Sequence, residues 1–358
     1  MAFDDLLEEN RPLAPFTTLG IGGPARWFLE ANTEEQVADA AAWARDQGVR
    51  LFVLGGGSNL VVSDDGFDGL IVHIALRGVE VGDAPHASGQ RIYRAAAGED
   101  WDRFVKRCCD ENCAGIECLA GIPGTVGGTP VQNVGAYGQE VSSTIERVRA
   151  FDLATHTWEE LGAWECRFSY RRSRFNTAHR RRFVVTRVDY RLTPGGAPTL
   201  TYADLQREFN SGAQPGLAEV AEAVRRIRQA KGMLLVEGDP DCRSAGSFFK
   251  NPIISEEHAA RVAGISGKQP PQYPAPDPGR VKIPAAWLIE QAGFKKGDAF
   301  ENAGISSRHT LALINRGGAT AREILALADK IRNAVQERFG ISLELEPVLL
   351  GFGSTPRL

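Results

Sequence analysis

The stretch GIPGTVGGTPVQNVGAYG, from Gly121 to Gly138, places six glycines in eighteen residues and contains no charged side chain. Glycine loses more conformational freedom on folding than other residues, so a cluster this dense indicates positive φ angles or a main chain that closely approaches a ligand. A ligand bound here would be held by backbone N–H groups, as phosphates and flat heterocycles often are. A tight turn without a ligand is the alternative that this stretch alone leaves open.

A second glycine cluster, GGGSN, runs from Gly55 to Asn59 directly after a predicted strand at 50–54. Leu60 stands where a dinucleotide-binding fingerprint needs its third glycine, and no helical pattern follows, which excludes a Rossmann motif. No Gly-Lys-Ser/Thr sequence ends the loop, so it is not a Walker loop either. What remains is a strand-to-loop corner whose N–H groups and Ser58 hydroxyl could hold a diphosphate, or a purely structural turn.

Length and composition set the broad class. A chain of 358 residues predicts two or three domains, and 43% hydrophobic with 24% charged residues is typical of a globular protein. The formal charge of -4 argues against a protein that mainly neutralises nucleic-acid phosphates. The acidic N-terminus lacks signal-peptide features and no apolar stretch could span a bilayer. We therefore expect a cytoplasmic monomer with no nucleic-acid or membrane partner.

Local patterns predict a mixture of helices and strands. Residues 33–47 predict a helix that begins with a Thr33 and Gln36 capping box, and LVVSDDGFDGLIVHI after the GGGSN loop predicts a hairpin. Further strands are expected at 91–97, 147–153 and 183–192, and helices at 283–293 and from Thr320 to Gly340. ISLELEPVLLGF predicts a final strand, and the proline-rich residues 270–278 predict an extended loop.

The cysteines do not suggest a metal site. No CxxC pair is present among the six, and no histidine is placed near them by sequence. Cys108 and Cys109 continue the helical spacing of Trp101, Phe104 and Val105, which predicts core positions in an amphipathic helix. We expect reduced thiols and no bound metal.

Three groups of residues could carry chemistry. Ser247 lies between Gly246 and two phenylalanines but has no GxSxG context and no paired base, so a buried turn serine remains the alternative. The arginines of YRRSRF predict an exposed basic face from which one guanidinium could bind a carboxylate or phosphate. Glu344 and Glu346 lie two apart in the predicted last strand and so share one face.

Taken in order, these motifs resemble the UDP-N-acetylenolpyruvoylglucosamine reductase family. The resemblance rests on GGGSN, AGIPGTVGG, GAYG, YRRSRF, GSFFKNP, the WLIEQAGF helix and a glutamate in the last strand, and it runs from Phe16 to Gly351. The proline-rich segment around Tyr273 is similar to the longer form of the family, which closes a tyrosine-bearing loop over its substrate. The implied fold class is α+β: a two-domain FAD-binding fold of the vanillyl-alcohol-oxidase (PCMH) type plus a separate α+β substrate-binding domain.

The resemblance implies noncovalent FAD as cofactor, NADPH as hydride donor and a UDP-sugar enolpyruvyl ether as substrate. In such enzymes the reduced flavin passes hydride from N5 to the β-carbon of the ether, giving UDP-N-acetylmuramate for peptidoglycan. The cofactor-binding residues that it implies come from both glycine clusters: Leu54, Gly55, Gly56, Gly57, Ser58, Asn59, Gly121, Ile122, Pro123, Gly124, Thr125, Gly127, Gly128, Asn133, Gly135, Ala136 and Tyr137.

The resemblance also implies three catalytic residues. Arg171 would stabilise the negative charge of the enolate formed by hydride addition. Ser247 would give a proton to its α-carbon, and Glu346 would polarise the intermediate or assist that proton delivery. The implied substrate contacts are Tyr170, Tyr202, Arg228, Lys231, Asn251, Tyr273, Lys282 and His309.

The implied domains are residues 1–75 and 76–231 with 341–358 for FAD, and 232–340 for the substrate. Three features depart from compact members of the family. The spacer between Lys231 and Ser247 is longer, His309 stands where some members have glutamine, and Pro347 follows Glu346 where many have valine. Proline removes one ladder hydrogen bond, which indicates a strand edge or a bulge at that point.

Two other readings stay open. A flavin oxidase of the same architecture would act on a different sugar or alcohol, but many such enzymes attach FAD through a histidine, which GGGSN lacks, and His73 falls in a predicted strand. The second alternative is a noncatalytic module that binds a nucleotide. A yellow protein that releases flavin on heating would argue against the second reading.

Overall fold

The computed structural model describes residues 3–84, 89–209, 212 and 214–353, arranged in two compact units. Unit 1 comprises residues 1–11, 25–57 and 68–229, and unit 2 comprises residues 12–24, 58–67 and 230–358. Each unit has its own hydrophobic core. The three-domain division predicted from the sequence stays a prediction, and its residues 1–2, 85–88, 210–211, 213 and 354–358 lie outside the described part of the chain.

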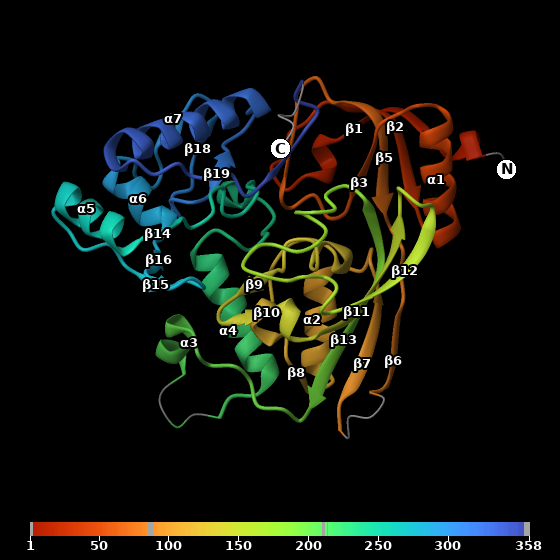
Figure 1. Ribbon diagram of the computed structural model, residues 1–358, viewed down its shortest axis with the longest axis horizontal. Helices are drawn as coiled ribbons and strands as arrows, with labels where there is room; N and C mark the ends of the chain where they lie inside the picture. Colours follow the sequence, from red (N-terminus) through yellow and green to blue (C-terminus); the bar gives the residue numbers. More distant parts are fainter. Residues whose placement is uncertain (1–2, 85–88, 210–211, 213, 354–358) are drawn as a thin grey trace. The chain divides into compact units, whose positions relative to one another are not determined.

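The main sheet of unit 1 has the strand order β12-β11-β13-β7-β6, and β8 pairs with the end of β13. These strands run side by side in Figure 1. The pairs within it are antiparallel. The first four residues of β13, Phe183 to Thr186, are all buried, and Val188, Tyr190 and Leu192 are buried further along. The bounds are β6 Val79–Asp83, β7 Arg91–Ala96, β8 Cys113–Ala114, β11 Ile145–Asp152, β12 Thr157–Gly162 and β13 Phe183–Pro194.

Helix α2, Trp101–Asp110, covers one face of this sheet. Its buried residues are the five that the sequence predicted, Trp101, Phe104, Val105, Cys108 and Cys109. The ring of Phe104 lies 5.2 Å from that of Tyr190 on β13 and 6.2 Å from that of Tyr93 on β7, measured between centroids. All six cysteines are buried free thiols, as expected, and burial raises the pKa of the Cys108 thiol.

A second sheet of unit 1 has the order β1-β2-β5-β3 and is accompanied by α1, Glu34–Asp46. The predicted capping box is present: Thr33 accepts a hydrogen bond from the Gln36 N–H, and the Gln36 side chain accepts one from the Thr33 N–H. The strands are β1 Glu8–Pro12, β2 Pro24–Ala31, β3 Leu51–Leu54 and β5 Phe67–Ile74. Unit 1 also contains α3 Ala203–Glu208, α4 Leu217–Ala230, and the short pair β9 Gly135–Ala136 and β10 Gln139–Glu140.

The hairpin predicted after the GGGSN loop is wrong. Strand β4, Leu60–Val62, pairs in parallel with β20 near the C-terminus, whereas β5 pairs in parallel with β3. Both strands are almost continuously buried, so their sequences carry no alternation that could identify a partner. Strands that are consecutive in the sequence lie next to each other in only about two-thirds of cases. Here the chain passes from one sheet to another between β4 and β5.

Unit 2 packs three helices with small sheets. Two sheets have the orders β14-β16-β15 and β17-β18-β19, and β20 pairs with β4. The helices are α5 Glu256–Ser266, α6 Ala285–Gln291 and α7 Ala321–Phe339, and the strands are β14 Ile253–Ser255, β15 Tyr273–Pro274, β16 Arg280–Lys282, β17 Ala299–Phe300, β18 Ala303–Ile305, β19 Leu313–Asn315 and β20 Val348–Leu350. The proline-rich segment is extended, as predicted, and contributes β15.

Capping residues set the ends of helix α7, and a proline precedes the start of strand β20. Helix α7 has the Thr320 and Glu323 capping box, and Gly340 ends it in the left-handed region with φ of 66°. The last strand is shorter than predicted, because it begins only at Val348, after Pro347. Proline has no N–H to donate, and the first ladder bond after it runs from the Val348 N–H to the Asn59 carbonyl, 2.9 Å.

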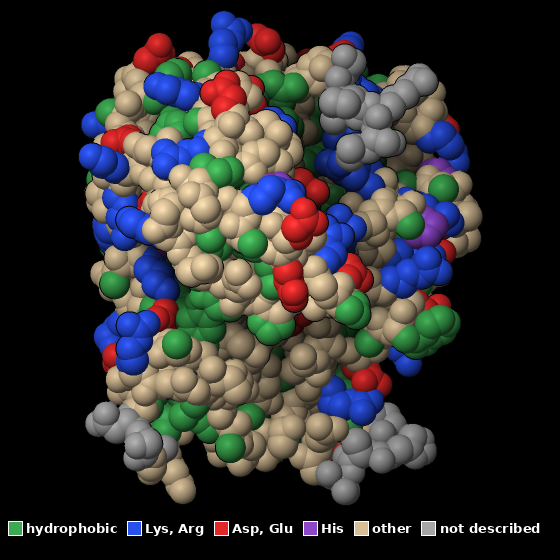
Figure 2. Space-filling view, turned by 60° about the vertical axis from the view of Figure 1, so that its left-hand side comes forward, with side chains coloured by type: hydrophobic (Ala, Val, Ile, Leu, Met, Phe, Trp, Pro, Cys, Tyr) green, Lys and Arg blue, Asp and Glu red, His purple; other side chains and the backbone are tan. Residues whose placement is uncertain are grey.

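The surface carries side chains of both charges. Figure 2 shows Lys and Arg side chains interspersed with Asp and Glu on the face that it presents. Among the described residues, no helix combines the length and apolar character needed to cross a bilayer. Short 3-10 turns, Phe3–Leu6, Ala14–Phe16, Glu117–Leu119, Val126–Gly128, Val141–Ser143 and Pro240–Cys242, connect the larger elements.

Candidate functional site

The two glycine clusters touch each other within unit 1. A Cβ added to Gly56 would lie 2.6 Å from the Gly124 Cα, and one added to Gly55 would lie 2.9 Å from the Thr125 hydroxyl oxygen. A side chain at Gly56 is therefore excluded by the neighbouring main chain, and one at Gly55 would crowd the Thr125 side chain; neither glycine is required by a positive φ. Gly57 has φ of 61° and Gly124 has φ of 129°, so these two need glycine for conformation.

Some main-chain donors in this glycine cradle, residues 55–57 and 121–128, are used by the protein and others are not: the Val126, Gly127 and Gly128 N–H groups donate to main-chain carbonyls. Within the described residues, the N–H groups of Gly56, Gly57 and Gly124 have no hydrogen-bond acceptor. Apart from its two chain neighbours, no described protein atom lies within 4 Å of a Cβ added at Gly128. Backbone N–H groups without acceptors suit a phosphate or a heterocycle, and buried ones are costly unless something accepts from them. The residues present therefore fit a flavin dinucleotide, which these amide groups could hold without charged side chains.

Asn133 fixes the second part of the loop. Its side chain is fully buried, and its amide donates to the Glu140 carboxylate at 2.8 Å and to the Ser169 carbonyl at 3.1 Å. The Asn133 carbonyl side-chain oxygen accepts from the Ser142 N–H at 3.1 Å. Asn133 thus joins the β9-β10 pair to Ser169, the residue before YRRSRF, and its expected cofactor role stays a prediction.

Arg171 lies against the same loop. Its guanidinium donates to the Gly135 carbonyl at 2.7 Å and lies 5.5 Å from the centre of the Tyr170 ring. Its main chain has φ of 54°, a left-handed conformation that is uncommon outside glycine and concentrates at functional sites. Because that guanidinium is anchored on one side, it is held in a fixed orientation in unit 1.

Two tyrosines meet beside the glycine loop. The rings of Tyr137 and Tyr202 are 5.3 Å apart, edge to face. Tyr137 also has a positive φ, 48°, and a Cβ added at Gly138 would lie 2.4 Å from the Thr201 hydroxyl oxygen. Tyr202 remains 42% exposed, so its ring can still contact another molecule.

Arg228 is buried in α4, at 8% exposure, and its Nε donates to the Gly121 carbonyl at 2.9 Å. Burial lowers the pKa of Arg228, and a hydrogen bond with Tyr137 opposes that shift. The expected substrate contact is therefore also a structural anchor of the glycine cradle.

Ser247 and Glu346 lie on adjacent segments of unit 2. The Glu346 N–H donates to the Phe248 carbonyl at 3.0 Å, and Phe249 forms a bridge with Leu345. In the part of the chain that the structure describes, the half-buried Ser247 hydroxyl has no hydrogen-bond partner. Asn59 holds the same region, because its side-chain amide donates to the Glu346 carbonyl at 3.2 Å. Ser58 belongs to the same segment of unit 2.

Three further expected substrate contacts surround the start of α6. Asn251 accepts a hydrogen bond from the Ala285 N–H at 2.9 Å and so caps the helix, which leaves its amide NH2 group for another acceptor. Tyr273 and Lys282 are paired residues on neighbouring strands β15 and β16. The Tyr273 side chain is 52% exposed. The structure thus brings these two expected residues together.

Lys231 and His309 are also brought together in unit 2. Burial, together with the charges of Lys231 and Lys296, lowers the pKa of His309 to about 4. The His309 Nδ1 accepts from the Leu311 N–H at 3.1 Å, so the neutral ring carries its proton on Nε2. Lys296 was missed by sequence reasoning, since nothing in KKGD distinguishes it from Lys295.

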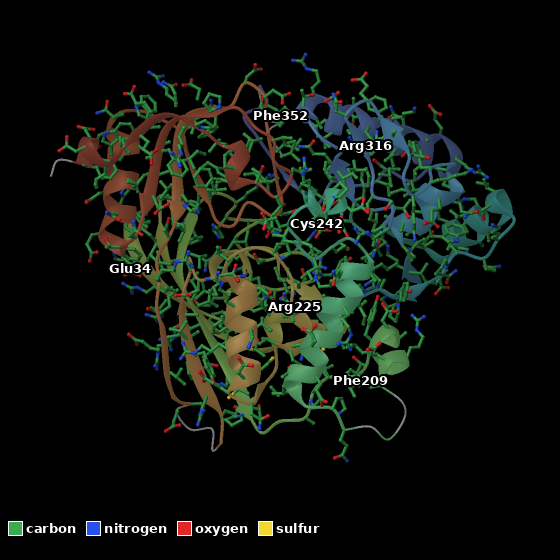
Figure 3. The ribbon with its side chains drawn as sticks, turned by 180° about the vertical axis from the view of Figure 1, so that it is seen from behind. Glu34, Phe209, Arg225, Cys242, Arg316 and Phe352 are labelled. Atoms are coloured by element: carbon green, nitrogen blue, oxygen red, sulfur yellow. The ribbon has the colours of Figure 1, made fainter. Side chains whose placement is uncertain are left out.

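The long spacer after Lys231 folds back onto the His309 loop. The Asp241 carboxylate accepts from the Ser307 N–H and hydroxyl at 3.0 and 2.7 Å and from the Arg308 Nε at 3.0 Å. The neighbouring Cys242, labelled in Figure 3, donates to the Leu234 carbonyl at 2.7 Å. The spacer is therefore ordered by its own contacts. Sequence reasoning missed Asp241 because no local pattern relates it to Ser307.

Across the described ranges, no group of three or more His, Cys, Asp or Glu side chains could hold a metal ion. Arg171 belongs to unit 1, and Ser247 and Glu346 belong to unit 2. Of the arginines of YRRSRF, Arg172 is exposed, whereas Arg171 and Arg174 are half-buried, so the segment is only partly an exposed basic face.

Two family profiles match separate parts of the chain. The FAD binding domain profile matches residues 25–162. The profile of the C-terminal domain of UDP-N-acetylenolpyruvoylglucosamine reductase matches residues 239–350. The first range contains the glycine cradle, and the second contains Ser247 and Glu346.

Similar proteins extend over nearly the whole chain. The UDP-N-acetylenolpyruvoylglucosamine reductase of Thermobifida fusca is 49% identical over 96% of this chain and 97% of its own length. That of Streptomyces coelicolor is 47% identical over 96% of this chain and 90% of its own. The crystal structure of the Thermus caldophilus reductase is 25% identical and has a TM-score of 0.64 over 96% of this chain and 98% of its own. These matches confirm the α+β fold class expected from the sequence.

Proposed function

The chain belongs to the UDP-N-acetylenolpyruvoylglucosamine reductase family. We propose that different residues of the chain bind the cofactor, stabilise the enolate and deliver the proton in the reductase reaction. Membership makes it an FAD-containing oxidoreductase of peptidoglycan precursor synthesis that acts on a UDP-sugar, and it implies NADPH as hydride donor. The flavin oxidase and the noncatalytic module are thereby set aside. The cytoplasmic location and the monomeric state remain predictions.

In our proposal, bound FAD would supply hydride transfer from NADPH to the β-carbon of the enolpyruvyl ether. The glycine cradle holds the cofactor through main-chain N–H groups. This assignment is supported by the donors of Gly56, Gly57 and Gly124, which no described acceptor uses, and by the open space at Gly128. Noncovalent binding is consistent with the absence of histidine from GGGSN.

Arg171 stabilises the negative charge that hydride addition places on the substrate. Its guanidinium is already oriented by the Gly135 carbonyl at 2.7 Å, so little reorganisation is needed when charge develops. A preorganised donor of this kind typically contributes a factor of about 10²–10³ to the rate. Tyr170 and Tyr202 flank this region as substrate contacts.

Ser247 delivers the proton to the α-carbon. The observation that carries this proposal is its half-buried hydroxyl, which has no partner among the described residues and lies one residue before the carbonyl that binds the Glu346 N–H. A hydroxyl is a weak acid, but an enolate is a base strong enough to take its proton in a dry site. Glu346 polarises the intermediate or assists this proton transfer.

The remaining cations and polar groups bind the UDP-sugar. Lys231 and neutral His309 lie in one cluster, and Tyr273 and Lys282 form a cross-strand pair. A diphosphate and a carboxylate give such lysines and hydrogen-bonding groups a ligand. Asn251 retains its amide NH2 group as a donor beyond the structural contact described above.

The experiment is a direct turnover assay with UDP-N-acetylglucosamine enolpyruvate and NADPH. We expect NADPH consumption that depends on the enolpyruvyl substrate, formation of UDP-N-acetylmuramate, and flavin absorbance that heat or acid releases. Protein that is colourless, does not take up added FAD and consumes no NADPH would rule the proposal out. Parallel rather than intersecting initial-rate lines are expected if NADPH and substrate bind in turn.

A further inference from the structure

Gly121, at the start of the glycine cradle, has both of its main-chain polar groups bound by side chains from two helices. Its N–H donates to the Asp102 carboxylate of α2 at 2.5 Å. Its carbonyl accepts from the Arg228 Nε of α4 at 2.9 Å. Gly121 itself has φ of 70°, so the chain turns here in a conformation that other residues rarely adopt.

Asp102 is in turn held by an ion pair with Arg225. The Arg225 guanidinium bonds directly to the Asp102 carboxylate, and the two side chains are 37% and 28% exposed. Arg225 and Arg228 are three residues apart on α4, so they lie on one face of that helix, and Figure 3 marks Arg225 on it. One helix face therefore reaches the Gly121 peptide groups twice, once directly and once through Asp102.

The same end of α2 holds two more points of the loop. The Trp101 N–H donates to the Gly124 carbonyl at 3.1 Å, and its indole N–H donates to the Leu119 carbonyl at 3.1 Å. Trp101 is 1% exposed and its ring packs against Tyr190, so it is a rigid support. Residues 119, 121 and 124 are thereby fixed, whereas the N–H of Gly124 stays free of any described acceptor.

We propose that Asp102 and Arg225 are positioning residues of the FAD site. By fixing the orientation of the peptides around Gly121, they hold the following residues, 122–128, in the conformation that binds the cofactor. A loop that is already ordered loses less conformational entropy on binding, so the dissociation constant is lower. This inference rests on the proposed cofactor role of the glycine cradle and adds residues that do not themselves contact FAD.

The test measures FAD release from the holoenzyme. Free FAD appears on dilution as a rise in flavin fluorescence, which gives the dissociation constant for wild type, Asp102→Asn, Arg225→Met and the double variant. We expect each single variant to raise the constant by about 3- to 10-fold. The FAD dissociation constant of the double variant should be no higher than that of the more affected single variant, because both substitutions remove the same ion pair. Arg225→Lys, which keeps the charge, should recover most of the loss.

Matched controls separate positioning from general stability. Lys106→Met removes an exposed ion pair with Asp110, 2.6 Å, from the same helix α2. It should leave the FAD dissociation constant unchanged. Urea midpoints at saturating FAD should be alike for Lys106→Met and Arg225→Met.

Three outcomes would overturn the inference. Dissociation constants equal to that of Lys106→Met would remove any positioning role, as would additive effects in the double variant. A loss of affinity matched by an equal fall in the urea midpoint would make the pair merely structural. If Asp102→Asn fails to fold, Arg225→Met and Arg225→Lys still decide the matter. Wild-type protein that binds no FAD would instead contradict the proposed function itself.

Discussion

The Glu346 N–H donates to the carbonyl oxygen of Phe248 at a distance of 3.0 Å, which places Glu346 opposite the residue that follows Ser247. The Lys250 N–H donates to the Glu344 carbonyl at 3.0 Å, so the two segments run antiparallel past each other. Phe248 and Phe249 are almost completely buried and anchor one side of this pairing. The separation of Ser247 and Glu346 is therefore set by main-chain bonds and core packing, not by flexible side chains.

Replacing Ser247 by alanine should separate the two halves of the reaction. We expect Ser247→Ala to be reduced by NADPH at close to the wild-type rate, because the hydroxyl acts only after hydride has left the flavin. Reoxidation by the enolpyruvyl substrate should slow by about 10²- to 10⁴-fold, the usual contribution of a positioned acid. Stopped-flow absorbance of the flavin measures both half-reactions separately.

Ser143→Ala is the matched control for that variant. Ser143 is exposed, and no described hydrogen bond uses its hydroxyl, so both half-reactions should be unchanged. A Ser247→Ala enzyme that loses the reductive half-reaction, or that reoxidises normally, would contradict the role proposed for Ser247.

Sequence reasoning succeeded where the information is local. The Thr33 capping box, the buried face of α2 and the left-handed Gly340 depend on residues within about one helical turn, and the structure confirms all three. The glycine loops were also identifiable, because Gly57 and Gly124 need conformations that other residues avoid.

Sequence reasoning failed where the decisive partner is distant. Strand β4 pairs with β20, almost three hundred residues later, and nothing in the sequence of either strand identifies the other as its partner. Asp241 reaches Ser307, and Asp102 reaches Arg225, through contacts with no local signal. The roles of Arg228 as an anchor and Asn251 as a helix cap likewise required the positions of Gly121 and Ala285.

The depressed pKa of His309 should make the protein less stable in acid. Its pKa of about 4 lies below the ordinary value of 6.5, because burial and the nearby charge of Lys231 disfavour the protonated ring. Between pH 6.5 and pH 4, the unfolded chain therefore binds a proton at His309 that the folded chain does not bind. This contribution to stability is complete above pH 6.5 and is lost as the pH falls towards 4, by up to about 3 kcal/mol.

His309→Gln tests that pH dependence. Glutamine cannot titrate, so the free energy of unfolding of the variant should fall less than that of wild type between pH 7 and pH 4.5, as measured by urea unfolding. His156→Gln is the matched control, since His156 is half-buried in a turn of unit 1, where its ring lies 5.9 Å from that of Phe151. Equal losses of stability in wild type and His309→Gln would show that the ring is not responsible.

Asp64 should stabilise α7 from outside the helix. Its carboxylate accepts from the N–H groups of Ala321 and Arg322 at 2.7 and 3.1 Å, the first two donors of the helix, while Thr320 accepts from the third. Asp64→Ala should therefore lower the free energy of unfolding by about 1–2 kcal/mol, as for a lost cap near a helix dipole. Asp65→Ala, next in sequence and exposed, should change it by less than about 0.5 kcal/mol.

Alanine at Gly56 and at Gly128 should distinguish protein packing from cofactor packing. A Cβ at Gly56 would lie 2.6 Å from the Gly124 Cα, so Gly56→Ala must separate the two glycine loops. At Gly128 a Cβ meets no described protein atom within 4 Å, and the backbone conformation is ordinary. Both variants should release FAD more readily on dilution, but only Gly56→Ala should lower the urea midpoint. Gly264→Ala, an exposed position in α5 with the same open space, should leave FAD release unchanged and raise stability by about 0.5–1 kcal/mol. If Gly128→Ala holds FAD as tightly as Gly264→Ala, the cofactor does not lie over Gly128, and the cradle must bind it through Gly56, Gly57 and Gly124 alone.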